Sequence, residues 1–489
     1  MKSHLGMYVH THWGYNRPYA ARAWTIEDWH GYLQGLSRMG FDIIKFWPQI
    51  DSMPSEPTAS DRVYLQDMGK MIDMAHAEFG MKVIVVATGN CMGNDEAGEY
   101  EFQSRPYFGC EKKVNPSDKA EVAQLLKARR NHLSYLANAD AITIIDSDPG
   151  GFIDSTNEEF ADLCTAQTKV FRELNPKGEF IYWMLMGWEN YNRFWKAQRD
   201  DPNATADMWD FRGGFDFKVT LEFMKERIPE PWSVFAWLPE HEKAIEATGL
   251  RHKAMYYPYG IIEGEPVFPL TLCNGVANGV PSPECRPYPL GQMGNAQTHC
   301  LQLPHTYWFA HLAQGGTMVN SSLAGFAEKL LPGLGELIAN GWRAIESADC
   351  GWQIKLAKDL RDKAGGKHQL GELSGLLFGD ADRFLIDLAM NLELRAALTD
   401  MVAAIDLKCR IKDRLEVVWE RLSAYQQRLG FVDAYSGFLF ERFNKQLKKL
   451  EDPALTKVLN GFEDWHNPAI RNGIMPRLLK AVGQYLGHE

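Results

Sequence analysis

Two aspartates, Asp146 and Asp148, end the apolar run in the segment AITIIDSDPGG (141–151). Side chains alternate along a strand, so both carboxyl groups are expected on one face. Two carboxyl groups this close repel each other when both are charged, which raises the pKa of one of them. Such a pair can supply a proton donor together with a base or polarising group, which is the chemistry of general acid–base catalysis. The alternative is that one aspartate merely caps the following loop.

Two glutamates are further candidates for a partner carboxylate. Glu189 stands in GWENYNRFW after the apolar run 179–188, and Glu263 stands in YPYGIIEGEP after the run 251–260. Carboxyl groups about 5 Å apart are typical of retaining glycosidases, and groups roughly 6.5–9.5 Å apart are typical of inverting ones. The sequence does not give this separation, and exposed acids on loops are common, so a plain surface role stays open for each glutamate.

The motif HTH places His10 and His12 on one face of the first apolar run, GMYVHTHW (6–13). Paired imidazoles are good ligands for Zn²⁺, and an HxH at the end of the first strand is the opening of the amidohydrolase metal site. A catalytic zinc usually has three protein ligands, and the expected His and Asp ligands are missing from the later runs. We therefore predict that both histidines hydrogen-bond substrate hydroxyls, with no metal and no other cofactor. A metal site and a core role for the histidines are the alternatives.

Aromatic and polar side chains recur where the apolar runs end. The chain has 15 Trp, and the apolar faces of sugar rings pack well on aromatic rings. Beside the two histidines, the residues expected to bind substrate are Trp13, Asn16, Arg17, Lys45, Trp47, Trp188, Trp237, Tyr257 and Asn295. The alternative is that most of these aromatic residues belong to the core and that the arginine forms a surface salt bridge.

Eight apolar runs are available to position these groups. They are 6–13, 41–47, 82–90, 141–151, 179–188, 232–238, 251–260 and 289–295. Helical stretches separate most of the runs; Thr25 is expected to cap the first helix, and TNEE (156–159) resembles a capping box. Because no GxGxxG follows any run, this alternation favours a (β/α)8 TIM barrel over a doubly wound sheet. The active site of such a barrel lies at the carboxyl ends of its strands.

The strand signal stops near residue 349, and the segments beyond it are amphipathic with interleaved charges. The fold class predicted is therefore α/β, a TIM barrel followed by an α-helical C-terminal domain. We place the catalytic barrel at residues 1–348 and the helical domain at residues 349–489.

The composition excludes several classes of protein. The chain has 489 residues, of which 45% are hydrophobic and 24% charged, with a net charge of −11. An acidic chain of this kind lacks the basic footprint of a nucleic-acid-binding protein or a membrane-surface patch, and it has no apolar run long enough to span a membrane. The first residues do not resemble a signal peptide. We expect a cytoplasmic protein, or a secreted or periplasmic one if a signal peptide has been removed. The sequence leaves open whether the protein forms a homo-oligomer.

The order of these features resembles a group of barrel glycoside hydrolases, the hexosaminidases, O-GlcNAcase-like enzymes and α-glucuronidases. The resemblance rests on HWGYNRPY after the first run, Lys45, IDSDPGG, the segment MGNAQTHCLQLPHTYWFAHLA, and the helical C-terminal part. In O-GlcNAcase-like enzymes two adjacent aspartates end strand 4, a lysine ends strand 2, and an asparagine-containing strand 8 leads into a helix. The resemblance implies these places for Asp146 with Asp148, for Lys45 and for Asn295. Here a serine separates the two aspartates.

The sequence thus predicts an exo-acting glycoside hydrolase with a carbohydrate substrate that ends in a terminal sugar. Acidic and N-acetylated sugars are among the candidates, and the sequence does not identify the sugar. Asp146 or Asp148 would be the general acid, and the other aspartate or one of the two glutamates its partner. A metal-dependent hydrolase of the amidohydrolase type, using His10 and His12, is the first alternative. A sugar-binding barrel without catalytic activity is the second.

Overall fold

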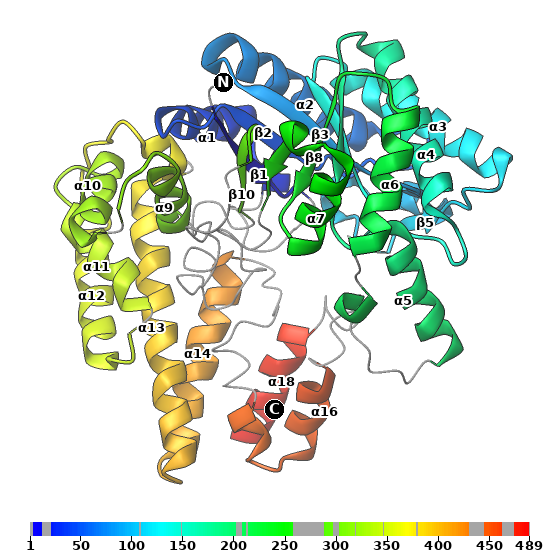
Figure 1. The fold of residues 1–489 in the computed structure, drawn as a ribbon. Coiled ribbons are helices and arrows are strands. Elements are labelled where there is room, and N and C mark those ends of the chain that lie inside the picture. Colours follow the sequence, from blue (N-terminus) through cyan, green and yellow to red (C-terminus); the bar gives the residue numbers. More distant parts are fainter. Residues whose placement is uncertain are drawn as a thin grey trace. The chain divides into compact units, whose positions relative to one another are not determined.

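The computed structural model divides the chain into two compact units (Figure 1). The first unit spans Met1–His12, Gly40–Tyr259 and Pro281–Asn295, and the second spans Trp13–Met39, Gly260–Val280 and Ala296–Glu489. The structure describes residues 3–11, 21–106, 109–147, 149–201, 208–211, 214–257, 288–296, 303–317, 319–345, 347–377, 380–429, 445–461 and 474–488.

A closed barrel of eight parallel strands forms the centre of the first unit. In their order around the barrel, the strands are β1 (His4–Val9), β2 (Ile43–Phe46), β3 (Lys82–Thr88), β6 (Ala141–Ile145), β7 (Glu179–Trp183), β8 (Trp232–Ala236), β9 (Ala254–Tyr256) and β10 (Gly291–Ala296). Each strand overlaps one of the eight apolar runs, so the predicted barrel is confirmed. A two-stranded antiparallel hairpin, β4 (Cys91–Gly93) with β5 (Glu111–Lys113), was not predicted, because three-residue strands carry little sequence signal.

Helices alternate with the strands of the barrel. They are α2 (Ala59–Phe79), α3 (Lys119–Leu133), α4 (Asn157–Leu174), α5 (Trp188–Asp200), α6 (Gly214–Arg227) and α7 (Pro239–Thr248). The predicted capping box of α4 is present, with the Thr156 hydroxyl accepting from the Glu159 backbone N–H. α2 starts in the same way at Thr58 and ends at Gly80, whose φ of 62° suits a residue without a side chain.

The register of the strands decides which side chains fill the barrel. Tyr8 lies opposite Lys45, and Lys45 lies opposite Ile84 on the next strand. The interior cluster contains Tyr8, Ile43, Trp47, Ile84, Val86, Ala141, Ile145, Ile181, Trp183, Phe235, Met255, Tyr257 and Met293. The residues between them point toward the helices. The ring of Tyr182, for example, lies 5.8 Å from that of Phe160 on α4. Strand ends therefore present their side chains either to the barrel interior or to the surrounding helices.

The described part of the second unit is helical, and its helices beyond residue 349 confirm the predicted helical C-terminal part. Its described helices are α1 (Ile26–Arg38), α9 (Leu303–Ala313), α10 (Asn320–Leu330), α11 (Gly335–Ile345), α12 (Cys350–Lys363), α13 (Ala381–Asp406), α14 (Ile411–Leu429), α16 (Pro453–Gly461) and α18 (Ile474–Leu486). The boundary proposed between residues 348 and 349 stays a prediction. None of the helices in the described ranges has the length and apolar character needed to cross a bilayer.

Helix α1 belongs to this second unit although it follows β1 in the sequence. It packs on a short 3-10 helix, η7 (Ser374–Leu377), through two glycines. A Cβ atom on Gly31 would lie only 2.9 Å from the carbonyl oxygen of Gly375. The two backbones can therefore approach only because both positions lack a side chain.

Candidate active site

A ring of aromatic side chains surrounds Lys45 inside the barrel. The Nζ atom of Lys45 lies 3.1 Å from the ring centroid of Trp183, 4.4 Å from that of Tyr257, 4.5 Å from that of Tyr8 and 4.8 Å from that of Phe235. All five side chains are buried and come from five different strands or strand ends. Aromatic faces attract a cation, so the ring is suited to the charged form of the lysine.

Polar partners for Lys45 are missing from the described part of the chain. No described hydrogen-bond acceptor and no described carboxylate pairs with its amine, and burial lowers the pKa of Lys45 well below its usual range. The Thr143 hydroxyl and the Trp183 indole N–H are also buried and have no described hydrogen-bond partner. Buried polar atoms in native proteins nearly always have partners, so the partners of these groups are to be sought outside the described residues.

His10 and Asn295 meet where β1 and β10 close the barrel. The Nε2 atom of His10 lies 2.5 Å from Oδ1 of Asn295, and both side chains are buried. Since the amide oxygen can only accept, His10 Nε2–H is the donor. The His10 ring also lies 4.1 Å from the ring of Tyr8, which faces Lys45. Asn295 therefore contacts His10, and His10 packs on the tyrosine that contacts Lys45.

Trp47 forms another wall of the same cluster, with its ring 6.2 Å from that of Trp183. Its indole N–H donates to Asp51 Oδ2 at 2.7 Å. The other oxygen of Asp51 accepts from the Thr88 hydroxyl and from the Arg129 guanidinium at 2.6 Å. Asp51 and Arg129 were not predicted. The sequence carried a signal for Asp51, because this aspartate stands four residues after a tryptophan at a strand end. It carried no signal for Arg129, which lies on α3.

Asp146 is placed differently from the prediction, because its side chain does not face the barrel interior. It is fully buried and accepts hydrogen bonds from the Tyr182 hydroxyl at 2.8 Å, the Ser147 hydroxyl at 2.8 Å, and the backbone N–H groups of Leu185 and Met186 at 3.2 and 3.1 Å. Burial raises the pKa of Asp146, although all of these donors oppose the shift.

The reason for this orientation is the parity of β6. Ala141 and Ile145 belong to the interior cluster, so Asp146, one residue later, follows the face that points to the helices. This carboxyl group is therefore enclosed by hydrogen-bond donors, and its predicted catalytic role stays a prediction. Asp146 ties the end of β6 to the backbone that follows β7.

Glu189 and Trp188 also lie outside the aromatic ring around Lys45. Glu189 accepts from the backbone N–H of Asn157 at 2.9 Å, at the start of α4, and lines a surface pocket of about 320 Å³ with residues of α5. Trp188 is buried, stacks on Phe160 and donates its indole N–H to Ser155. Both residues thus pack in the helical layer.

Of the remaining predicted residues, Trp237 is half-buried and packs against the interior cluster, and Tyr257 belongs to that cluster. Other predicted site residues lie outside the described residues: His12, Trp13, Asn16, Arg17, Asp148 and Glu263. In the ranges that the structure describes, no three His, Cys, Asp or Glu side chains are grouped so that they could hold a metal ion. The prediction of no metal stays a prediction, because His12 is not among the residues searched.

Tyr8 and Phe235 were not among the predicted binding residues, although they surround Lys45 together with Trp183. The alternation of side chains carried a signal for one of them. Tyr8 stands two residues before His10 and therefore had to share its face.

No protein-family model matches the chain, and no curated protein does. Solved structures of glycoside hydrolases resemble it. A family GH138 enzyme targeting pectin rhamnogalacturonan II has a TM-score of 0.46 at 8% identity, covering 95% of this chain and 68% of its own. An O-GlcNAc hydrolase mutant from Thermobaculum terrenum has a TM-score of 0.43 at 12% identity, covering 100% and 96%. A β-N-acetylhexosaminidase from Bacteroides fragilis has a TM-score of 0.40 at 9% identity, covering 67% and 69%. The likeness is one of fold alone.

Proposed function

We propose that the protein is an exo-acting glycoside hydrolase whose substrate ends in an acidic sugar. The observation that carries this proposal is the buried amine of Lys45, which has aromatic faces around it and no described anionic partner. A charged group in an apolar site is costly unless it is paired. A sugar carboxylate would provide the missing charge, and it would favour the protonated form of the amine.

The rest of the cluster supports a sugar as the carrier of that carboxylate. Trp47, Trp183 and Tyr257 offer ring surfaces to the C–H groups of a pyranose. The Thr143 hydroxyl and the Trp183 indole N–H can bind sugar hydroxyls. Lys45, at the end of β2, also lies at the carboxyl end of the barrel, where barrel enzymes hold their substrates.

For the chemical step, we propose Asp148 as the general acid. It would give its proton to the departing glycosidic oxygen, while a second carboxylate, with Glu263 as our candidate, stabilises or attacks the anomeric carbon or activates water. Asp146 is a positioning residue in this proposal. Its hydrogen bonds to Leu185 and Met186 anchor the segment that leads to Asp148.

The experiment is a hydrolysis screen with nitrophenyl uronides and sialosides, together with neutral hexosides and N-acetylhexosaminides. We expect the wild type to prefer an acidic sugar, and Asp148→Asn to lower turnover by ~10²-fold or more. In Lys45→Met the preference for the acidic over the matching neutral sugar should collapse. Equal activity on both sugars in the wild type, or an unchanged preference in Lys45→Met, would contradict the proposal.

A further inference from the structure

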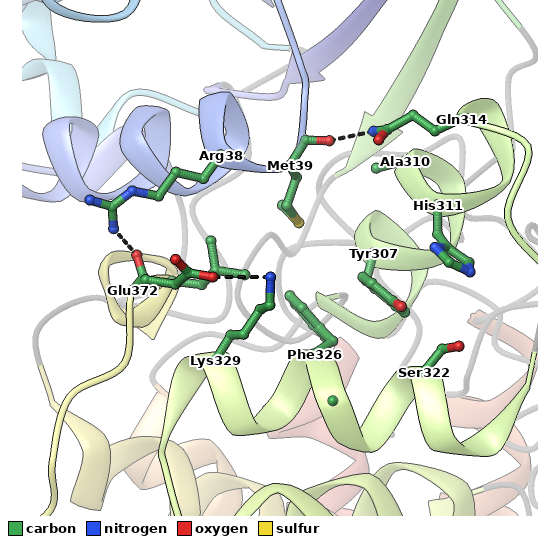
Figure 2. A pocket seen from close by; sticks show the side chains of 12 residues that line it. Arg38, Met39, Tyr307, Ala310, His311, Gln314, Ser322, Phe326, Lys329 and Glu372 are labelled. Atoms are coloured by element: carbon green, nitrogen blue, oxygen red, sulfur yellow. Dashed lines mark hydrogen bonds and ion pairs between the residues drawn. The ribbon is translucent and has the colours of Figure 1, made fainter.

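A pocket of about 390 Å³ lies within the second unit, lined by α9, α10, the end of α1 and residues 372–373 (Figure 2). Small-molecule sites in proteins usually measure roughly 300–1,000 Å³, so one sugar-sized ligand fits. Part of the lining is apolar and comes from Met39, Ala310 and Phe326. The proposed active site in the barrel uses none of these residues.

A column of stacked aromatic rings forms one side of this pocket. Tyr307 stacks on Phe326 with ring centroids 4.5 Å apart and on His311 at 5.3 Å. Phe326 in turn stacks on Trp342 at 5.9 Å. Burial raises the pKa of Tyr307, whose hydroxyl pairs with Ser322. The column therefore brings a hydroxyl pair and aromatic rings to the pocket.

The polar rim carries charges of both signs. Arg38 donates to the carbonyl oxygen of Glu372, and Lys329 Nζ lies 3.0 Å from Glu372 Oε1. Gln314 donates to the carbonyl oxygen of Met39 at 2.7 Å (Figure 2). Within the described part of the chain, Arg38 and Lys329 keep further donors for a ligand, and Gln314 and Glu372 keep further acceptors.

We infer that this pocket binds a neutral sugar ring and forms a carbohydrate site of its own on the second unit. Lys329 and Glu372 already form an ion pair, so an anion would have to compete with Glu372 and a cation with Lys329. A purely apolar ligand would displace water from the polar groups of the rim and give no hydrogen bond in return. A pyranose satisfies both requirements, because its hydroxyls donate and accept while its C–H face is apolar. This inference does not depend on the proposed hydrolase activity.

Gly325 makes the inference testable with little disturbance of the fold. It lines the pocket from the middle of α10, and a Cβ atom at this position would meet no atom within 4 Å. A glycine inside a helix lowers helix stability relative to alanine, and packing does not require one here. Gly325→Leu would place a side chain in the pocket, and Gly325→Ala is its matched control.

The measurement is saturation-transfer NMR on the full chain with methyl β-glucopyranoside, methyl β-galactopyranoside, methyl β-glucuronide and benzoate. We expect a neutral glycoside to bind the wild type and Gly325→Ala alike, and to bind Gly325→Leu at least about tenfold more weakly. Melting temperatures establish that the variants are folded. Should Gly325→Leu not fold, Ser322→Leu blocks the pocket from the same helix.

The outcomes separate this inference from the proposed function. Neutral glycosides that bind wild type and Gly325→Leu equally, or bind neither, would overturn the sugar site. A benzoate or glucuronide signal that alone responds to Gly325→Leu would also overturn it, because the ligand would then be an anion. If glucuronide binding is weakened by Lys45→Met but not by Gly325→Leu, the glucuronide binds in the barrel. If the glucuronide does not bind there at all, only the proposed function is contradicted.

Discussion

The indole N–H of Trp47 donates to Asp51 at 2.7 Å, which connects an aromatic wall of the barrel interior to a buried ion pair. Asp51 is bonded at the same time to Arg129, whose side chain is fully buried. The orientation of Trp47 therefore depends on a charge pair that lies outside the cluster around Lys45. Such pairs matter most when one partner is removed, because the other charge is then left buried and alone.

Arg129→Met should lower the free energy of unfolding by about 3–5 kcal/mol, the usual cost of breaking a buried ion pair. The matched control is Lys127→Met on the same helix, which breaks an exposed pair with Glu56 and should change stability by no more than about 1 kcal/mol. Urea unfolding measures both. Similar losses in the two variants would contradict the importance of the buried pair.

Lys45→Met should change the pH dependence of stability. Burial lowers the pKa of Lys45 in the folded state, so the unfolded chain binds more protons below the ordinary lysine pKa. Stability should then rise with pH from the lowered pKa up to the unfolded value, by at most about 1.4 kcal/mol per pH unit. Urea unfolding at pH 7 and pH 9 should show a larger rise in the wild type than in Lys45→Met. Identical slopes would argue against a neutral buried amine.

Asp216, on α6, should lower the free energy of unfolding as the pH rises. Burial raises its pKa to about 6, while it accepts hydrogen bonds from the Asn157 side chain and the Asn190 backbone. Its stabilising contribution is complete below the unfolded pKa and is lost as the pH rises through about 6. The loss of stability between pH 4 and pH 7.5 should be smaller in Asp216→Asn than in the wild type. The exposed Glu222→Gln on the same helix is the control and should behave like the wild type.

Asp146→Asn and Asp148→Asn should fail in different ways. Asp146 accepts from two hydroxyls and two backbone N–H groups, and an amide group can accept from only some of these donors. We expect Asp146→Asn to lose about 1–3 kcal/mol of stability, read as a lower melting temperature. Asp148→Asn should keep the melting temperature and lose turnover. An unchanged melting temperature in Asp146→Asn would contradict the anchoring role.

Activity should survive exhaustive chelation, because our proposed mechanism uses carboxylates and no metal. At the described end of β1, His10 is hydrogen-bonded to Asn295. A catalytic zinc usually has three protein ligands. Elemental analysis of active protein is the direct test. Stoichiometric zinc that is lost together with activity in His10→Ala would favour the metal-dependent hydrolase.

The sequence by itself determined the eight strands and most of their helices, because these depend on local patterns. The runs around Lys45 and Trp183 are short and apolar, and helix caps such as Thr156 with Glu159 lie within one turn of the residues they serve. The candidates Lys45, His10 and Asn295 followed from strand ends, since every parallel strand of a barrel delivers its carboxyl end to the same side.

Only the tertiary structure decided which face of a strand points inward. Both faces of β6 are buried and mostly apolar, so alternation alone could not show that Ile145 faces the interior and Asp146 the helices. The close approach of Gly31 to Gly375, which joins α1 to the second unit, also involves residues far apart in the sequence. Such contacts leave no periodic signal, because they depend on the fit of two surfaces that meet only after the chain has folded.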